Sequence, residues 1–287
     1  MKNLPPWFRQ DIPGKKQEAL SEFLFIRKID TVCRQALCPN INACFENNQL
    51  TFLILGKQCT RSCSFCNIEK YRGEDLLLDA DEPSKIAQAV KDIGIKYAVV
   101  TSVTRDDLPD GGAANFSETV KAITSLNPDV KTEVLIPDFR GERLSIEVVV
   151  RAGPYIIAHN IETVRRLYPE VRPQADYERS LKVLSIIKEV DRNIFTKSSL
   201  MLGMGEKQDE VFEAMEDLRK NNCDFITLGQ YLAPSDKHYP AFEFLTPEQF
   251  KSYEDKARIM GFKNVSSGPL VRSSYFAHTL LGELKHA

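Results

Sequence analysis

Six of the seven cysteines form two separate triplets within a short stretch of the sequence. The first has the spacing C-x4-C-x5-C and comprises Cys33, Cys38 and Cys44. The second has the spacing C-x3-C-x2-C and comprises Cys59, Cys63 and Cys66. A structural zinc ion or an ordinary electron-transfer cluster takes four protein ligands, whereas three cysteines on a four-iron cluster leave one iron open. We therefore predict two 4Fe-4S clusters, each with a fourth iron site that has a function of its own.

The second triplet directly follows the first of six apolar segments that are predicted to be strands. Continuous apolar runs of this kind are typical of parallel strands covered on both faces, and they span 51–56, 97–103, 131–139, 155–160, 195–203 and 225–232. Between them lie segments with helical periodicity, such as the stripe formed by Ile86, Val90 and Ile93. Further helices are predicted at 115–126, 145–152, 180–190, 211–218 and 247–260.

Six strand–helix units in alternation predict an α/β fold with a parallel sheet. With right-handed crossovers, these units close most of the way into a partial (β/α)6 TIM-like barrel, and a flat, doubly wound sheet is the alternative. Residues 1–50 are predicted to be an N-terminal extension, 51–263 the barrel and 264–287 a C-terminal extension. Because catalytic residues of such barrels collect at the C-terminal ends of the strands, the second triplet is expected at the mouth.

The composition excludes several classes of partner. The chain has 287 residues, 43% of them hydrophobic, and a net charge of −2, which gives no broad attraction to nucleic acid or anionic membranes. No apolar stretch is long enough to span a bilayer, and Met1–Gln10 lacks the apolar core of an export signal. Clustered cysteines in an odd number suit metal binding in a reducing compartment. We expect a cytoplasmic protein, or an organelle-matrix protein after processing.

The position and spacing of the second triplet resemble the radical S-adenosylmethionine (SAM) superfamily. The resemblance implies that the open iron binds the amino and carboxylate groups of SAM and passes one electron to it, which releases a 5′-deoxyadenosyl radical. Phe65 matches the aromatic residue that this superfamily places beside the adenine. A zinc knuckle, or loop cysteines without a chemical role, is the alternative reading of these residues.

Over nearly the whole chain the sequence resembles the lipoyl synthase family. The stretches that carry the resemblance are 36–41 (ALCPNI), 100–112 (VTSVTRDDLPDGG), 159–164 (HNIETV), 196–198 (TKS), 229–232 (GQYL) and 267–275 (SGPLVRSSY). The resemblance implies insertion of two sulfur atoms, at C6 and C8 of a protein-bound octanoyl-lysine, with one SAM cleaved for each hydrogen removed. It also implies that the auxiliary cluster on the first triplet supplies the sulfur and is consumed.

The fourth ligand of the auxiliary cluster is implied to be a serine of Arg-Ser-Ser-Tyr, which falls on Ser274, with Ser273 as the neighbouring candidate. A serine oxygen is a harder ligand than a thiolate, so it can release one iron from a cluster that must be dismantled. The rival thiol, Cys223, precedes the sixth predicted strand and therefore lies towards the opposite end of the barrel. We expect it to be a small buried core residue.

Four further residues are predicted to contact SAM. Ser102 follows the second strand, Asn160 and Glu162 follow the fourth, and Lys197 lies on the fifth. Three of them have a simpler explanation: a capped surface loop for Ser102, a helix N-cap for Asn160 and a solvated barrel rim for Lys197. Gln174 departs from the family pattern, in which a glycine is expected before Ala-Asp-Tyr.

The resemblance implies octanoylated lipoyl carrier domains as substrates, namely the E2 subunits of 2-oxoacid dehydrogenases and the glycine cleavage H protein. It also implies an electron donor and an iron–sulfur cluster carrier, and nothing in the sequence requires more than a monomer. Two other functions are considered. One is a radical SAM enzyme that modifies a peptide or a nucleotide, and the other is a non-catalytic zinc-binding interaction module.

Overall fold

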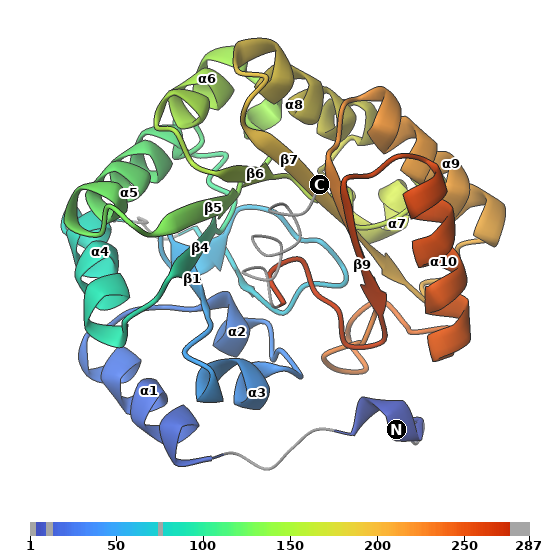
Figure 1. Ribbon diagram of the computed structural model, residues 1–287, viewed down its shortest axis with the longest axis horizontal. Coiled ribbons are helices and arrows are strands. Elements are labelled where there is room, and N and C mark those ends of the chain that lie inside the picture. Colours follow the sequence, from blue (N-terminus) through green and yellow to red (C-terminus); the bar gives the residue numbers. More distant parts are fainter. Residues whose placement is uncertain (1–3, 10–13, 74–76, 276–287) are drawn as a thin grey trace.

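The central sheet closes most of the way into a barrel (Figure 1). A computed structural model describes residues 4–9, 14–73 and 77–275. Within them, seven parallel strands follow the order β1-β4-β5-β6-β7-β8-β9, with β1 and β9 at the two edges. Their bounds are β1 Thr51–Ile54, β4 Tyr97–Ser102, β5 Lys131–Leu135, β6 Ile156–Ala158, β7 Phe195–Leu202, β8 Phe225–Gln230 and β9 Asn264–Gly268. The predicted partial barrel is confirmed.

Helices form an outer ring around the strands (Figure 1). They are α4 Glu82–Ile93, α5 Ala113–Leu126, α6 Arg143–Arg151, α7 Tyr168–Val171, α8 Tyr177–Val190, α9 Gln208–Lys220 and α10 Pro247–Ile259, with the short 3-10 helices η2 Phe139–Gly141 and η3 Arg165–Leu167. The predicted apolar stripe of α4 is buried against the sheet, since Ile86 and Val90 are almost inaccessible. The third strand ends earlier than predicted, at Leu135, because Pro137 has no backbone N–H to offer the ladder.

One strand was not foreseen in the sequence. β9 begins at Asn264, the first residue of the predicted C-terminal extension, and pairs in parallel with β8 from Phe225↔Asn264 to Gly229↔Gly268. The sheet therefore continues into that extension. Residues 276–287 of the predicted extension lie outside the described residues, and the division into 1–50, 51–263 and 264–287 stays a prediction.

The N-terminal extension lies where the ring of helices is open, between α4 and α10 (Figure 1). It contains η1 Pro6–Phe8, α1 Lys15–Ile26, α2 Val32–Gln35 and α3 Ile41–Glu46. It is joined to the edge strand β1 by an antiparallel bridge between Thr31 and Phe52 and by a hydrogen bond from Leu53 N to Asp30 O of 2.9 Å. The extension therefore covers the exposed edge of the sheet.

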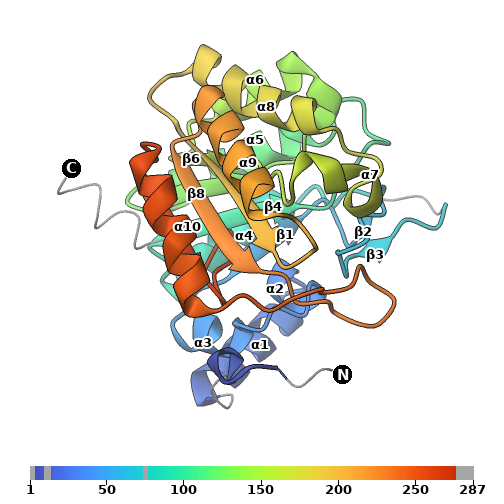
Figure 2. The same cartoon turned by 90° about the vertical axis from the view of Figure 1, so that its right-hand side faces the viewer.

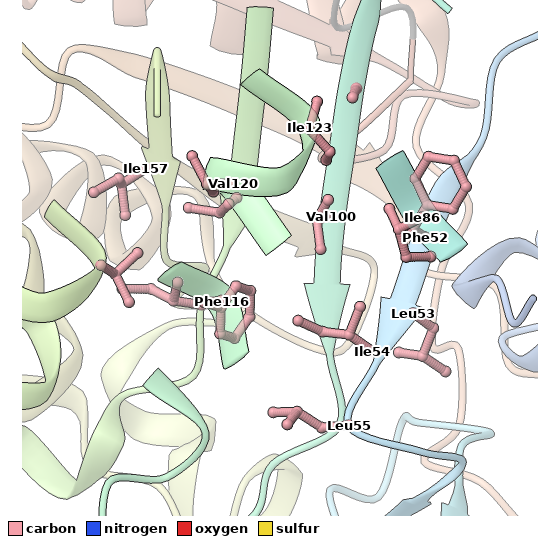
Figure 3. Packing of buried hydrophobic residues seen from close by; sticks show 14 of the residues in the cluster. Phe52, Leu53, Ile54, Leu55, Ile86, Val100, Phe116, Val120, Ile123 and Ile157 are labelled. Carbon is pink, nitrogen blue, oxygen red and sulfur yellow. The ribbon is translucent and has the colours of Figure 1, made fainter. Parts of the chain in front are cut away.

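The largest hydrophobic core joins the extension to the first half of the barrel. Leu24 and Phe45 of the extension are fully buried in the same cluster as β1, β4 and α5. Figure 3 shows side chains from these strands and helices, including Phe52, Val100 and Phe116, packed into one layer. A second cluster fills the space beneath α9 and α10.

Candidate iron–sulfur and SAM site

The second triplet lies in the loop between β1 and α4, at the C-terminal ends of the strands. A short parallel ladder within this loop pairs β2 Gln58–Cys59 with β3 Glu69–Lys70. The loop is tied to α7 by a hydrogen bond from Ser64 N to Val171 O of 3.0 Å. Figure 2 shows β2, β3 and α7 side by side at one end of the barrel. The three cysteines thus lie where the sequence predicted them.

A buried arginine inside the triplet anchors this loop to two other strands. Arg61, between Cys59 and Cys63, is 5% exposed and donates two hydrogen bonds to Asp138 (2.7 and 2.9 Å) and two to Asp106 (2.7 and 2.9 Å). Burial opposes ionisation of Asp138, but the hydrogen bonds and positive charge of Arg61 hold the pKa of Asp138 well below its usual range. The backbone N–H of Arg61 also donates to Cys59 Sγ (3.4 Å).

Two half-buried thiols of the second triplet, those of Cys63 and Cys66, lie near positive charges. Burial raises the pKa of Cys66 to about 11, and it raises the pKa of Cys63 although the nearby Arg172 opposes the shift. Arg172 is itself buried and donates to the carbonyl oxygen of Asn160 at 3.0 Å. Burial disfavours the thiolate forms of Cys63 and Cys66, and a bound cluster would supply the positive charge that stabilises them.

The residues predicted to contact SAM lie around the same mouth. Ser102 is the last residue of β4, and its Oγ is buried without a hydrogen-bond partner among the described residues. Asn160 Nδ2 donates to Glu162 Oε1 (3.0 Å), and burial raises the pKa of Glu162 while Arg172 lowers it. Glu162 has a left-handed backbone, with φ of 65°. Phe65 packs against the second core cluster.

Lys197 has a partner inside the barrel. It is the third residue of β7, and its Nζ lies 2.9 Å from Glu133 Oε1, with both side chains 1% exposed. The second oxygen of Glu133 accepts a hydrogen bond from the Tyr97 hydroxyl (2.7 Å). This ion pair compensates the buried charge of Lys197, so no bound ligand is needed to explain it. The predicted contact of Lys197 with SAM stays a prediction.

The first triplet lines a cavity of about 300 Å³ together with Ser274. Cys33, Cys38 and Cys44 lie close enough for their charges to interact, and burial raises the pKa of Cys33 and of Cys44 to about 12. The positive charge of Arg272 acts on Cys38, and both residues line this cavity. In addition, Asn67 Nδ2 of the second triplet's loop donates to Gln35 O of α2 (2.7 Å), so the segments that carry the two triplets are in contact.

The two candidate serines face different sites. Ser274 Oγ accepts a hydrogen bond from Thr51 Oγ1 (2.8 Å) and lines the cavity of the first triplet. Ser273 Oγ donates instead to Asn160 Oδ1 (3.2 Å), one of the residues predicted to contact SAM. Cys223 is fully buried and its Sγ donates to Phe225 O (3.2 Å), which confirms that it is a core residue.

The donor sets fit the groups that the sequence implies. At the first triplet, three thiols, one hydroxyl and the cation of Arg272 line one cavity, which suits an anionic cluster with one oxygen ligand. At the mouth, three thiols lie near a buried arginine and an unpartnered Ser102 hydroxyl, which suits a cluster beside a polar ligand. Within the described residues, no three His, Cys, Asp or Glu side chains converge on the position of a single ion.

Comparison with known proteins agrees with this description. A profile of the Radical SAM superfamily matches residues 53–229. The lipoyl synthase of Caldicellulosiruptor bescii is 52% identical over 274 residues, which cover 95% of this chain and 94% of that protein. The lipoyl synthase of Caldicellulosiruptor saccharolyticus is 51% identical over 276 residues, or 95% of each chain. Among solved structures, methylornithine synthase (PylB) superposes with a TM-score of 0.55 at 13% identity, over 79% of this chain and 75% of that one.

The parallel barrel and the superfamily match together define a radical SAM protein. Half of the residues are identical to those of curated lipoyl synthases over almost the entire length. The chain belongs to the lipoyl synthase family. This membership disfavours both the zinc-binding module and a radical SAM enzyme that modifies a peptide or a nucleotide.

Several residues of the site were not singled out in the sequence. Arg61 lies within the second triplet and Asp138 lies near the end of the third predicted strand, but no local signal pairs residues 77 positions apart. Gln174, noted as a departure from the family pattern, accepts a hydrogen bond from Ser62 N (2.6 Å) and so contacts the loop that carries the second triplet. Thr51 lies on the first predicted strand. Its hydrogen bond to Ser274 could not be predicted, because the bond depends on the path of the C-terminal segment.

Proposed function

We propose that this protein is a lipoyl synthase, a radical SAM enzyme that converts a protein-bound octanoyl-lysine into lipoyl-lysine. The observation that carries the proposal is the identity of about one half to curated lipoyl synthases over 95% of the chain. When bound, the clusters and SAM supply the electron, the radicals that remove one hydrogen each from C6 and C8, and the two sulfur atoms that replace them.

The residues of the chain have the following proposed roles. Cys59, Cys63 and Cys66 hold the cluster at the mouth, with SAM beside Phe65, Ser102, Asn160, Glu162 and Lys197. The first triplet, Cys33, Cys38 and Cys44, holds the auxiliary cluster, and Ser274 is its fourth ligand. The cavity shared by this triplet and Ser274 supports the second assignment. The barrel walls and the N-terminal extension exclude water, which protects a reactive radical from side reactions.

The substrate is an octanoylated lipoyl carrier domain, whose long lysine arm reaches into the barrel. The E2 subunits of 2-oxoacid dehydrogenases and the glycine cleavage H protein are the proposed carriers, and an electron donor and a cluster carrier complete the cycle. We propose a monomer that works in the cytoplasm or in an organelle matrix. Among the described helices, none combines the length and apolar character needed to cross a bilayer.

The decisive experiment follows both products of one reaction. Reconstituted protein is incubated anaerobically with dithionite, SAM and an octanoyl-lysine peptide, and mass spectrometry quantifies peptide-bound sulfur and 5′-deoxyadenosine. We expect a peptide that gains two sulfur atoms while 5′-deoxyadenosine accumulates. Production of 5′-deoxyadenosine with an unchanged peptide would contradict lipoyl synthesis.

The serine assignment is tested with a pair of neighbouring variants. Ser274→Ala is expected to lower the sulfur inserted per 5′-deoxyadenosine by about 100-fold, while cleavage of SAM continues, because a ligand of the auxiliary cluster is lost. Ser273→Ala should retain sulfur insertion, since its hydroxyl faces Asn160 rather than the first triplet. The opposite pattern would assign the ligand to Ser273.

A further inference from the structure

The segment Leu270–Tyr275, here called the C-terminal strap, brings Ser274 to the first triplet from the far end of the sequence. Two contacts tie the strap to the region of the triplet. Asn40 Nδ2 donates to Leu270 O (2.6 Å), and Thr51 Oγ1 donates to Ser274 Oγ (2.8 Å). Asn40 lies between Cys38 and Cys44 and is almost fully buried. The strap is therefore held against the triplet by side chains that are not cluster ligands.

Gly229 on β8 provides the space in which the strap lies. A Cβ atom at Gly229 would lie 2.0 Å from Val271 O and 2.9 Å from Val271 C, which is impossible without moving the strap backbone. Gly229 does not have a left-handed backbone, so its conformation does not require glycine. The absence of a side chain here serves the close approach of another segment.

The paired glycine on the next strand provides a comparison. Gly268 on β9 lies opposite Gly229 in the sheet. A Cβ atom at Gly268 would lie 3.4 Å from Val271 Cγ2, an ordinary contact with a side chain. A methyl group at 268 is therefore tolerated, whereas the same group at 229 displaces the strap.

Thr51 connects Ser274 with the triplet. It is the first residue of β1 and 3% exposed. It lines the cavity of the first triplet together with Cys33 and Ser274. One buried residue thus lies in the cavity of the triplet and donates a hydrogen bond to the hydroxyl of Ser274, which fixes the direction of the serine oxygen.

We propose that Gly229 and Thr51 are positioning residues for Ser274, Gly229 by leaving room for the strap and Thr51 by orienting the serine hydroxyl. This inference rests on the proposed auxiliary-cluster role of Ser274. Both act through the position of one ligand.

Hydrogen exchange of the iron-free full-length protein tests the steric half of the inference. Gly229→Ala is expected to raise amide exchange in the peptide that contains the strap by about tenfold, with peptides from β5 unchanged as an internal reference. Gly268→Ala, the matched control, should exchange like the wild type. Equal exchange in all three proteins would overturn the role of Gly229.

The hydroxyl of Thr51 is tested with two variants of the reconstituted protein. Thr51→Val keeps the shape and removes the donor, and we expect about a tenfold loss of sulfur insertion per 5′-deoxyadenosine and an altered Mössbauer spectrum of the auxiliary cluster. Thr51→Ser restores the hydroxyl and should restore both. Wild-type behaviour of Thr51→Val would overturn its role. If the wild type inserted no sulfur, the proposed function would fail, while the exchange comparison would still decide whether Gly229 holds the strap.

Discussion

At the scale of single residues, the position of the loop that carries the second triplet depends on the charge of Arg61, which the cysteine spacing does not reveal. Arg61 lies within the second triplet and joins Asp106, after β4, to Asp138, after β5. Asp138 is fully buried and also pairs with Arg179 at 2.8 Å. The loop that carries three thiols is therefore fixed to two neighbouring strands by one guanidinium group, whose planar donors suit two carboxylates at once.

Replacement of this arginine should be costly. Arg61→Gln leaves Asp138 with less compensation for its buried charge, and we expect a loss of about 3 kcal/mol in the free energy of unfolding, measured with urea on iron-free protein. Arg140→Gln is the control, because Arg140 pairs with the same Asp106 from a side chain that is 60% exposed. The control should lose less than about 1 kcal/mol. Equal losses would contradict the anchoring role of Arg61.

At the scale of elements, the beginnings of three strands meet at one buried carboxylate. Asp224 precedes β8 and accepts a hydrogen bond from Thr196 N of β7 (3.0 Å). It also pairs with Lys188 (2.5 Å) and with Lys263, the residue before β9 (2.8 Å). Burial opposes its ionisation, but the hydrogen bonds from the two lysines lower the pKa of Asp224. The late strand β9 is thus tied to the rest of the sheet by charge as well as by its ladder.

This carboxylate gives a prediction for stability against pH. Asp224→Asn is expected to cost about 3 kcal/mol at pH 7, because two lysines lose their partner. The pKa of Asp224 is lower in the folded than in the unfolded protein. Its contribution is therefore present above the unfolded value of about 3.9 and is lost as the pH falls through the folded value.

Urea unfolding between pH 7 and pH 3.5 should show the difference between wild type and Asp224→Asn shrinking below about pH 4. Asp255→Asn serves as the control, since Asp255 is 56% exposed and makes only a surface pair with Lys251. A difference that stayed constant over this range would mean that the charge of Asp224 is not what stabilises the strands.

Most of the elements could be predicted, and the exceptions have physical reasons. The six predicted strands carry continuous apolar runs, whereas β9 reads Asn-Val-Ser-Ser-Gly and has only Val265 as a large apolar residue. Its strand character comes from the ladder with β8, which no local pattern encodes. The cysteine spacings are local and visible in the sequence. The choice between Ser273 and Ser274, the pairing of Lys197 with Glu133 and the clearance at Gly229 all depend on segments distant in the sequence.

At the scale of the whole molecule, the N-terminal extension and the barrel share a core. Phe45 in α3 is fully buried in the same cluster as β1 and β4. Phe45→Ala should lower the free energy of unfolding by about 4 kcal/mol, and unfolding should remain a single transition by circular dichroism and tryptophan fluorescence. Phe25→Ala in α1 is the control, since Phe25 is 76% exposed, and should cost less than about 0.5 kcal/mol. Two separate transitions would show that the extension folds independently.

The way the strap reaches the first triplet also constrains how the protein is made. Thr51 and Ser274, which touch in the folded protein, are 223 residues apart in the chain. At about 5 to 20 residues per second, a ribosome needs roughly 10 to 45 s to travel from one to the other. During that time the three cysteines of the first triplet have been synthesised, but Ser274, the proposed fourth ligand, has not. The site that is proposed to give up its sulfur can therefore be completed only after the barrel has been synthesised, and a truncated nascent chain offers iron an incomplete set of ligands.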